Sequence, residues 1–169
     1  MKQIVILFAA AILALATSLN VFAAEPDKPG TKLITVQAGY GPGIGALLTG
    51  NIAMADLGAA HLYGGLALGG HFRHGFDAKR TDLSVAPRLF LGFPLSRVFE
   101  LHFGAQAGIA ARLYGAEGLP NDLVFSYAGF GGFRISVSDS VAIIAEGYYA
   151  YPTKCLHIPF GTAGLAFRF

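Results

Sequence analysis

Seven ionisable side chains stand at alternate positions within apolar stretches of this sequence. They are Arg73, Arg88, Glu100, His102, Arg112, Arg134 and Glu146. On a β-strand successive side chains point to opposite faces, so each of these residues would share a face with the other polar residues of its stretch. The set predicts buried ion pairs, or a narrow polar path that its four arginines and two glutamates would make selective for anions.

Other residue types that serve catalysis or metal binding form no convincing pattern. His71 and His74 are three apart, so on a strand they would point to opposite faces, with no Asp, Glu or Cys at a useful spacing. His157, Ser126 and Glu146 supply the residue types of a hydrolytic triad, but no local signature surrounds them. We therefore expect no metal, no cofactor and no catalytic residue.

The glycine-rich segment 39–45 and the single cysteine also predict no site. Segment 39–45 lacks the G-x-G-x-x-G pattern, and no capped amphipathic helix follows it. Hairpins and strand bends explain these glycines better. Cys155 is the only cysteine, which excludes an internal disulfide and leaves an intermolecular bridge or, more commonly, an unpaired thiol.

The composition of the 169 residues indicates a surface that faces lipid. Hydrophobic residues make up 54% and charged residues 13%, with 23 glycines and a mean hydropathy of +0.55. A soluble globular domain has about 25% charged residues. The formal net charge of +2 is also too small for a nucleic-acid-binding surface, so we expect no nucleic-acid partner.

The first part of the chain has the pattern of an export signal. Residues 1–23 contain Lys2, an apolar run over 4–16 and small residues before a predicted cut after Ala23, with a cut after Ala24 as the alternative. This run is shorter than the roughly 20 apolar residues that a membrane helix needs. Residues 24–32, with two prolines and a glycine, predict a flexible lead-in to the folded domain.

The remaining residues alternate between apolar and polar side chains in short stretches. In the clearest stretch, 98–114, every polar residue falls on one parity, which a helical period would not produce. A transmembrane strand needs about 9–11 residues and shows this alternation. The same test predicts strands over 34–40, 46–54, 62–73, 83–93, 98–114, 124–137, 141–151 and 158–169. The predicted fold is all-β, an eight-stranded antiparallel up-and-down transmembrane β-barrel over residues 33–169.

The connections between these stretches alternate in length, as outer-membrane barrels require. Short turns over 94–97 and 138–140 lie between longer segments at 74–82, 115–122 and 152–157. The link after Tyr40 is the exception because it is almost absent, which makes the register of the first hairpin the least secure.

Two other folds fit the sequence less well than the barrel. Segment 33–55 has 23 residues without a charge, but its five glycines and one proline disfavour a membrane helix. A soluble ligand-carrying barrel has an apolar interior and a charged exterior. This chain would then expose its apolar parity to water, a severe aggregation hazard.

The chain ends with apolar side chains at alternate positions, at Leu165, Phe167 and Phe169. This ending resembles the C-terminal signal that the bacterial barrel-assembly machinery recognises. The whole mature chain resembles the small outer-membrane β-barrels, such as outer membrane proteins X and W and the membrane domain of outer membrane protein A. The resemblance implies an integral outer-membrane location, contact with outer-membrane lipids, and the assembly machinery as a partner during insertion.

The predicted strand number sets what the lumen can do. An eight-stranded barrel has an interior just wide enough for side chains to fill, which excludes a wide general porin. An arginine facing lipid at mid-depth costs about 2–4 kcal/mol, so the seven ionisable residues belong in the lumen. As diagonal cross-strand neighbours, Glu100 is expected beside Arg88, and Glu146 beside Arg134.

We therefore expect a non-enzymatic, porin-like barrel with a side-chain-filled polar lumen. Its role would be structural or in surface interaction, with an unknown surface partner on the longer loops. One alternative is a narrow channel for small or hydrophobic solutes. The other is an outer-leaflet lipid-modifying enzyme, a class that the resemblance also includes.

Overall fold

The fold of the protein is given by a computed structural model that describes residues 27–41, 43–74, 79–114, 121–152 and 158–169. The strands in these ranges are β1 (Lys32–Tyr40), β2 (Ile44–Asp56), β3 (His61–His74), β4 (Lys79–Pro94), β5 (Phe99–Tyr114), β6 (Asp122–Ser136), β7 (Val141–Pro152) and β8 (Ile158–Arg168). Within these ranges there is no helix of the length and apolarity that a membrane span would need. The predicted all-β class is confirmed.

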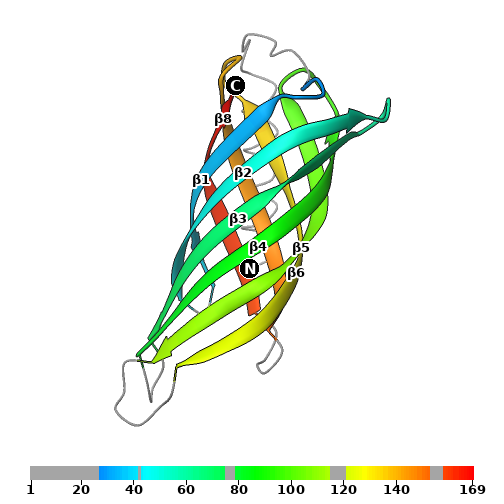
Figure 1. Ribbon diagram of the computed structural model, residues 1–169. Coiled ribbons are helices and arrows are strands. Elements are labelled where there is room, and N and C mark those ends of the chain that lie inside the picture. The colour runs from blue at the N-terminus through cyan, green and yellow to red at the C-terminus, as the bar shows by residue number, and fades with distance from the viewer. Residues whose placement is uncertain (1–26, 42, 75–78, 115–120, 153–157) are drawn as a thin grey trace.

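The eight strands close into one barrel in which each strand pairs antiparallel with its neighbours along the chain (Figure 1). β1 also pairs with β8, from Leu33 opposite Arg168 to Tyr40 opposite Gly161, so the sheet has no free edge. Closure gives every strand a hydrogen-bonded neighbour on both sides, as a strand in hydrocarbon requires. The predicted eight-stranded up-and-down barrel is confirmed.

The two faces of the barrel wall differ in polarity, as the alternation predicts. Inward side chains such as Thr35, Gln37 and Thr49 are at most 2% exposed. The outer face carries exposed, large apolar side chains on every strand, including Ile34, Ile44, Leu66, Leu89, Phe103, Phe125, Ile143 and Leu165. A soluble protein would not present such a continuous apolar belt to water.

Two connections bear on the predicted loop lengths. In the first hairpin Tyr40 pairs directly with Ile44, so the link is as short as the sequence indicates. The prediction of a long segment over 74–82 is wrong, because β3 and β4 stay paired as far as His74 opposite Lys79. Residues 80–82 therefore belong to the wall of the barrel.

Glycines let neighbouring strands approach closely around the small barrel. A Cβ atom on Gly164 would lie 2.0 Å from the carbonyl oxygen of Val36 on β1. A Cβ atom on Gly108 would lie 2.0 Å from the carbonyl oxygen of Val85 on β4. Both distances are far below van der Waals contact, so a side chain at either position would force the wall to shift.

The connections define two different ends of the barrel. The turn end carries the links at 57–60, 95–98 and 137–140, together with the start of β1 and the C-terminus. In Figure 1 this end is at the top, beside the label of the C-terminus. The opposite end, called the loop end below, carries the links after β1, β3, β5 and β7.

Candidate functional site

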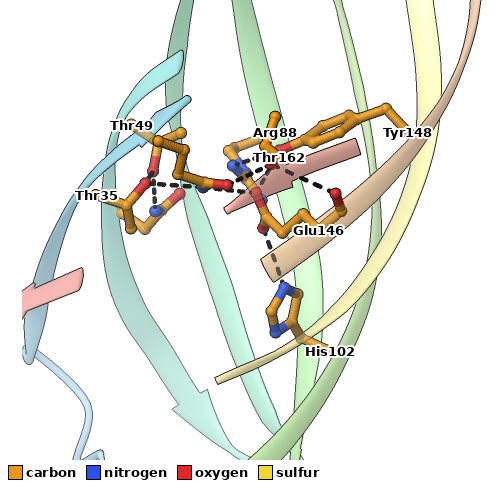
Figure 2. A network of polar contacts seen from close by, with 9 residues as sticks. Thr35, Thr49, Arg88, His102, Glu146, Tyr148 and Thr162 are labelled. Atoms are coloured by element: carbon orange, nitrogen blue, oxygen red, sulfur yellow. Dashed lines mark hydrogen bonds and ion pairs between the residues drawn. The ribbon is translucent and has the colours of Figure 1, made fainter. Parts of the chain in front are cut away.

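A buried carboxylate on β7, Glu146, lies at the centre of the lumen and is surrounded by hydrogen-bond donors (Figure 2). Arg88 Nη2 donates a hydrogen bond of 2.7 Å to Glu146 Oε1, and His102 Nε2 lies 3.0 Å from the same oxygen. Gln37 Nε2 donates to Glu146 Oε2 at 2.8 Å, and the Tyr148 hydroxyl donates to that oxygen too. Four strands thus meet at one carboxylate.

Neutral polar side chains extend this arrangement to β1, β2 and β8. The Thr162 hydroxyl donates to Gln37 Oε1 at 2.5 Å, and Gln37 Nε2 is 3.1 Å from Thr35 Oγ1. The hydroxyls of Thr35 and Thr49 share a hydrogen bond of 2.8 Å, and Asn51 Nδ2 donates to Thr49 Oγ1 at 2.8 Å. Together with Arg88, His102, Glu146 and Tyr148, these residues form what we call the Glu146 network.

A second ionic group, the Arg134 cluster, lies nearer the turn end. Arg134 Nη2 donates to Glu100 Oε2 at 2.8 Å and to Asp27 Oδ2 at 2.5 Å. The Tyr63 hydroxyl donates to Asp27 Oδ2 at 2.7 Å, and Arg168 Nε lies 2.6 Å from Asp27 Oδ1. These five residues come from β3, β5, β6, β8 and the segment before β1.

Asp27 corrects the prediction of a flexible lead-in for the part of segment 24–32 that the structure describes. Its side chain is fully buried, and Lys32 already belongs to β1. Burial by itself raises the pKa of the Asp27 carboxyl, but the charges of Arg134 and Arg168 and the hydrogen bond from Tyr63 outweigh this effect. The pKa of Asp27 is lowered, and this ionised carboxylate ties the chain to the turn end of the lumen.

Aromatic rings pack around and between the two ionic groups. The Arg88 guanidinium lies 4.1 Å from the ring centre of Phe130 and 5.1 Å from that of Phe90. Phe90 stacks on Tyr63 at 4.6 Å, and Phe130 stacks on Tyr148 at 5.4 Å. Rings and ion pairs together fill the middle of the lumen, as the barrel radius predicts.

The structure brings most of the predicted lumen residues together but changes their pairing. The inward residues Arg88, Glu100, His102, Arg112, Arg134 and Glu146 are at most 8% exposed. Arg73 lies in β3, and its side chain is outside the part of the chain that the structure describes.

The prediction that Glu100 lies beside Arg88 is wrong. Glu146 and Arg134 are diagonal neighbours on β7 and β6, as predicted, but each forms its ion pair with another residue. Glu100 instead binds Arg134, its direct partner on β6, and Arg88 reaches across the lumen to Glu146. On β4 the register partner of Glu100 is Pro94, which is six positions from Arg88. The prediction compared only strands that are adjacent in a hairpin. In a narrow lumen, side chains also meet from opposite walls.

The neutral and aromatic parts of the site were not predicted from the sequence. The neutral residues Thr35, Gln37, Thr49, Asn51 and Thr162 lie on the polar parity of the predicted strands 34–40, 46–54 and 158–169. That shared parity is the signal that marks them as lumen residues. Their mutual hydrogen bonds depend on the register between strands, which the parity alone does not contain.

The remaining candidates do not form a site among the described residues. His71 lies in β3 and packs its ring against Phe160 at 5.1 Å. The side chains of His74, Cys155 and His157 lie outside the described part of the chain. Across the ranges that the structure describes, no three His, Cys, Asp or Glu side chains gather closely enough to hold a metal ion.

The residues of the predicted C-terminal assembly signal lie on the outer face of the barrel, with Leu165 and Phe167 in β8 and Phe169 directly after it. Leu165 and Phe169 are 45% and 71% exposed, and Phe167 on the same parity is half-buried. The backbone N–H of Phe169 donates to the Lys32 carbonyl at 2.9 Å, which anchors the last residue to β1. Recognition by the assembly machinery remains a prediction.

A closed antiparallel barrel with an apolar exterior and a polar, ion-paired interior defines a transmembrane β-barrel. Solved structures with the same fold include small outer-membrane barrels. Neisserial surface protein A matches with a TM-score of 0.61 and 12% identity, over 82% of this chain and 95% of that chain. Ail, the attachment invasion locus protein of Yersinia pestis, matches with a TM-score of 0.60 and 14% identity, over 84% and 100%.

The same fold also occurs in an outer-membrane enzyme. PagL matches with a TM-score of 0.52 and 15% identity, over 81% of this chain and 98% of that chain. No protein-family model and no curated protein sequence matches the chain. At these identities the structural likeness establishes the fold, that of the small eight-stranded outer-membrane barrels.

Proposed function

We propose that the protein is an integral outer-membrane barrel with a structural or surface-interaction role and a lumen that does not conduct solutes. One observation carries this proposal. The Arg88 and Glu146 side chains are each only 1% exposed, and their ion pair joins β4 to β7 across the lumen. A solute that passed through the barrel would have to break this pair and separate the aromatic rings around it.

The energetics of buried ion pairs favour a permanently closed lumen. Removing one partner from a buried pair costs about 3–5 kcal/mol, because the remaining charge is left without compensation. Glu146 is also held by Gln37, His102 and Tyr148, so opening would break several hydrogen bonds at once. The network would instead make the barrel a rigid support for the segments at its loop end, where binding residues are commonly found.

The location and partners belong to the same proposal. Residues 1–23 would direct export, and Leu165, Phe167 and Phe169 would be recognised by the barrel-assembly machinery during insertion. Outer-membrane lipids would then cover the exposed apolar belt, and the loop end would face outward toward an unknown surface partner. The name of Neisserial surface protein A and that of Ail as an attachment invasion locus protein are consistent with this orientation.

Conductance measurements test the closed lumen directly. Purified protein is inserted into planar lipid bilayers, and single-channel currents are recorded for the wild type, Arg88→Ala and the exposed-turn control Arg97→Ala. We expect no steady current steps from the wild type or the control. Steady steps in the wild type that decrease in Arg88→Ala would refute the closed lumen and favour the narrow anion-selective channel.

We also propose that the barrel has no catalytic activity. Glu146, the acid of the hypothetical triad, is occupied by Arg88 and by three further partners. Mass spectrometry of lipid A from cells with and without the gene tests this part of the proposal. The spectra should be identical, and a consistent change in acyl chains would instead favour a lipid-modifying enzyme.

A further inference from the structure

A separate cavity lies in the lumen toward the loop end, beyond the Glu146 network. Its volume is about 140 Å³. Its lining includes Leu47, Gln106, Ala110, Arg112, Ala128 and Phe160. Tyr148 also lines this cavity and donates a hydrogen bond to Glu146, so the network forms its inner boundary. A molecule that entered from the loop end would therefore meet a closed floor.

Arg112 is a buried cation without a full set of partners at this cavity. It is 2% exposed, and its Nε and Nη2 atoms have no hydrogen-bond partner among the described residues. The Asp82 carboxylate lies 3.9 Å from Arg112 Nε, but Arg80 already binds both oxygens of that carboxylate, at 2.7 and 2.5 Å. Leaving buried guanidinium donors unpaired is unfavourable unless water or a ligand satisfies them.

The geometry of Arg112 and the cavity walls point to one class of ligand. Nε and Nη2 lie on one edge of the guanidinium, and this pair of donors matches the two oxygens of a carboxylate. Leu47, Ala110, Ala128 and Phe160 provide apolar walls. Gln106 Oε1 is a further buried atom of the lining without a hydrogen-bond partner in the described part of the chain.

We propose that this cavity is a binding site for a small monocarboxylate with a short apolar body. Arg112 pairs with the carboxylate through Nε and Nη2, and the apolar walls accept the rest of the molecule. A single incompletely paired cation favours a monoanion over a dianion such as hydrogen phosphate, whose second charge would be left uncompensated. The ligand is bound at this site and is not transported, since the Glu146 network blocks passage through the lumen. This inference adds a ligand to the structural role proposed above.

Calorimetric titration of the full mature barrel in detergent micelles tests the site. Benzoate, butyrate and inorganic phosphate serve as probes, and the proteins are the wild type, Arg112→Gln, Arg112→Lys and Arg97→Gln. Arg97 is an exposed arginine of the turn at the opposite end of the barrel, which makes it the matched control. Heat-modifiable migration on gels establishes that each variant is folded before titration.

We expect saturable one-site binding of benzoate or butyrate to the wild type and to Arg97→Gln. Arg112→Gln removes the positive charge and the parallel Nε and Nη2 donors, so it should weaken carboxylate binding by at least about tenfold. Arg112→Lys keeps the charge but not the pair of parallel donors, so its affinity should fall between the two. A shift of the Gln106 side-chain amide resonance on addition of benzoate would locate the ligand in this cavity.

Three results would overturn the proposal. The first is the absence of saturable carboxylate binding at millimolar concentrations, and the second is equal affinity in the wild type and folded Arg112→Gln. The third is tighter binding of phosphate than of either carboxylate, which would exclude the monocarboxylate class. If Arg112→Gln does not fold, Arg112→Lys and the Gln106 resonance still decide the question. Conductance by the wild type would refute the closed lumen without altering these binding results.

Discussion

The ion pair between Arg88 and Glu146 should dominate the stability of the barrel wall at mid-lumen. The Arg88→Met variant removes a hydrogen bond of 2.7 Å between two charged groups that are each 1% exposed. It also removes the contact of the guanidinium with the Phe130 ring at 4.1 Å. Hydrogen bonds to charged groups contribute about 1.5–3 kcal/mol, and a desolvated cation–π contact contributes about 2 kcal/mol.

These contributions, with Glu146 left as an uncompensated buried charge, predict that Arg88→Met lowers the free energy of unfolding by about 3–5 kcal/mol. Glu146→Gln should have a similar effect because it leaves the Arg88 cation without its carboxylate. The combined Arg88→Met and Glu146→Gln variant should lose less than the sum of the two single variants. We expect the coupling energy to be about 0.5–3 kcal/mol, as for residues in one hydrogen-bond network.

Equilibrium unfolding in urea, with the barrel in lipid vesicles, measures these free energies, and the folded fraction is read from gel migration. Arg97→Met is the control, since this arginine lies in an exposed turn, and its effect should be within about 0.5 kcal/mol of zero. Single-variant effects as small as that of the control would refute the reasoning. So would strictly additive effects in the combined variant, because the two side chains would then be energetically independent.

Three further outcomes follow from particular positions. Asp27 has a folded-state pKa below its ordinary value of 3.8, so its stabilising contribution is present above that pH and is lost as the pH falls further. Asp27→Asn should therefore lower the free energy of unfolding at neutral pH. Below about pH 4 the variant should lose less of this free energy with falling pH than the wild type does. The free energy of unfolding is measured against pH, and parallel curves for the two proteins would contradict this. Gly164→Ala places a Cβ atom 2.0 Å from a backbone carbonyl of β1 and should destabilise the barrel by about 1–3 kcal/mol in urea, whereas Gly50→Ala, with open space around its Cβ, should have little effect. Leu89→Arg places a charge in the apolar belt and should lower the free energy of unfolding in vesicles by about 2–4 kcal/mol. The control Leu95→Arg, in an exposed turn, should lower it by almost nothing. Equal effects of the two variants would argue against lipid contact at Leu89.

The predicted and observed sites differ in a consistent way. Predictions that needed only one strand are confirmed, such as the inward direction of Arg88, Glu100 and Glu146. Predictions that needed two strands depended on an assumed register. Glu100 does not lie beside Arg88, and the diagonal neighbours Glu146 and Arg134 form their ion pairs with other residues. The register partner of Glu100 on β4 is Pro94, so no hairpin contact brings it to Arg88.

The start of the domain shows the same distinction. Segment 24–32 has the composition of a flexible lead-in, and nothing local in the sequence marks Asp27 as different. Its carboxylate is buried because Arg134 on β6 and Arg168 on β8 converge at the turn end of the closed barrel. These two arginines are 107 and 141 positions further along the chain, so only the folded structure brings them to Asp27.

By itself, the sequence determined the number of strands, the side of the wall on which each side chain lies, and hence the apolar exterior and polar lumen. It could do so because side chains alternate along a strand whatever its neighbours are. Only the tertiary structure decided which arginine binds which carboxylate, and that Arg112 keeps unpaired donors beside a cavity. Those contacts depend on the tilt and stagger of strands around the closed barrel, which set the height at which each side chain enters the lumen.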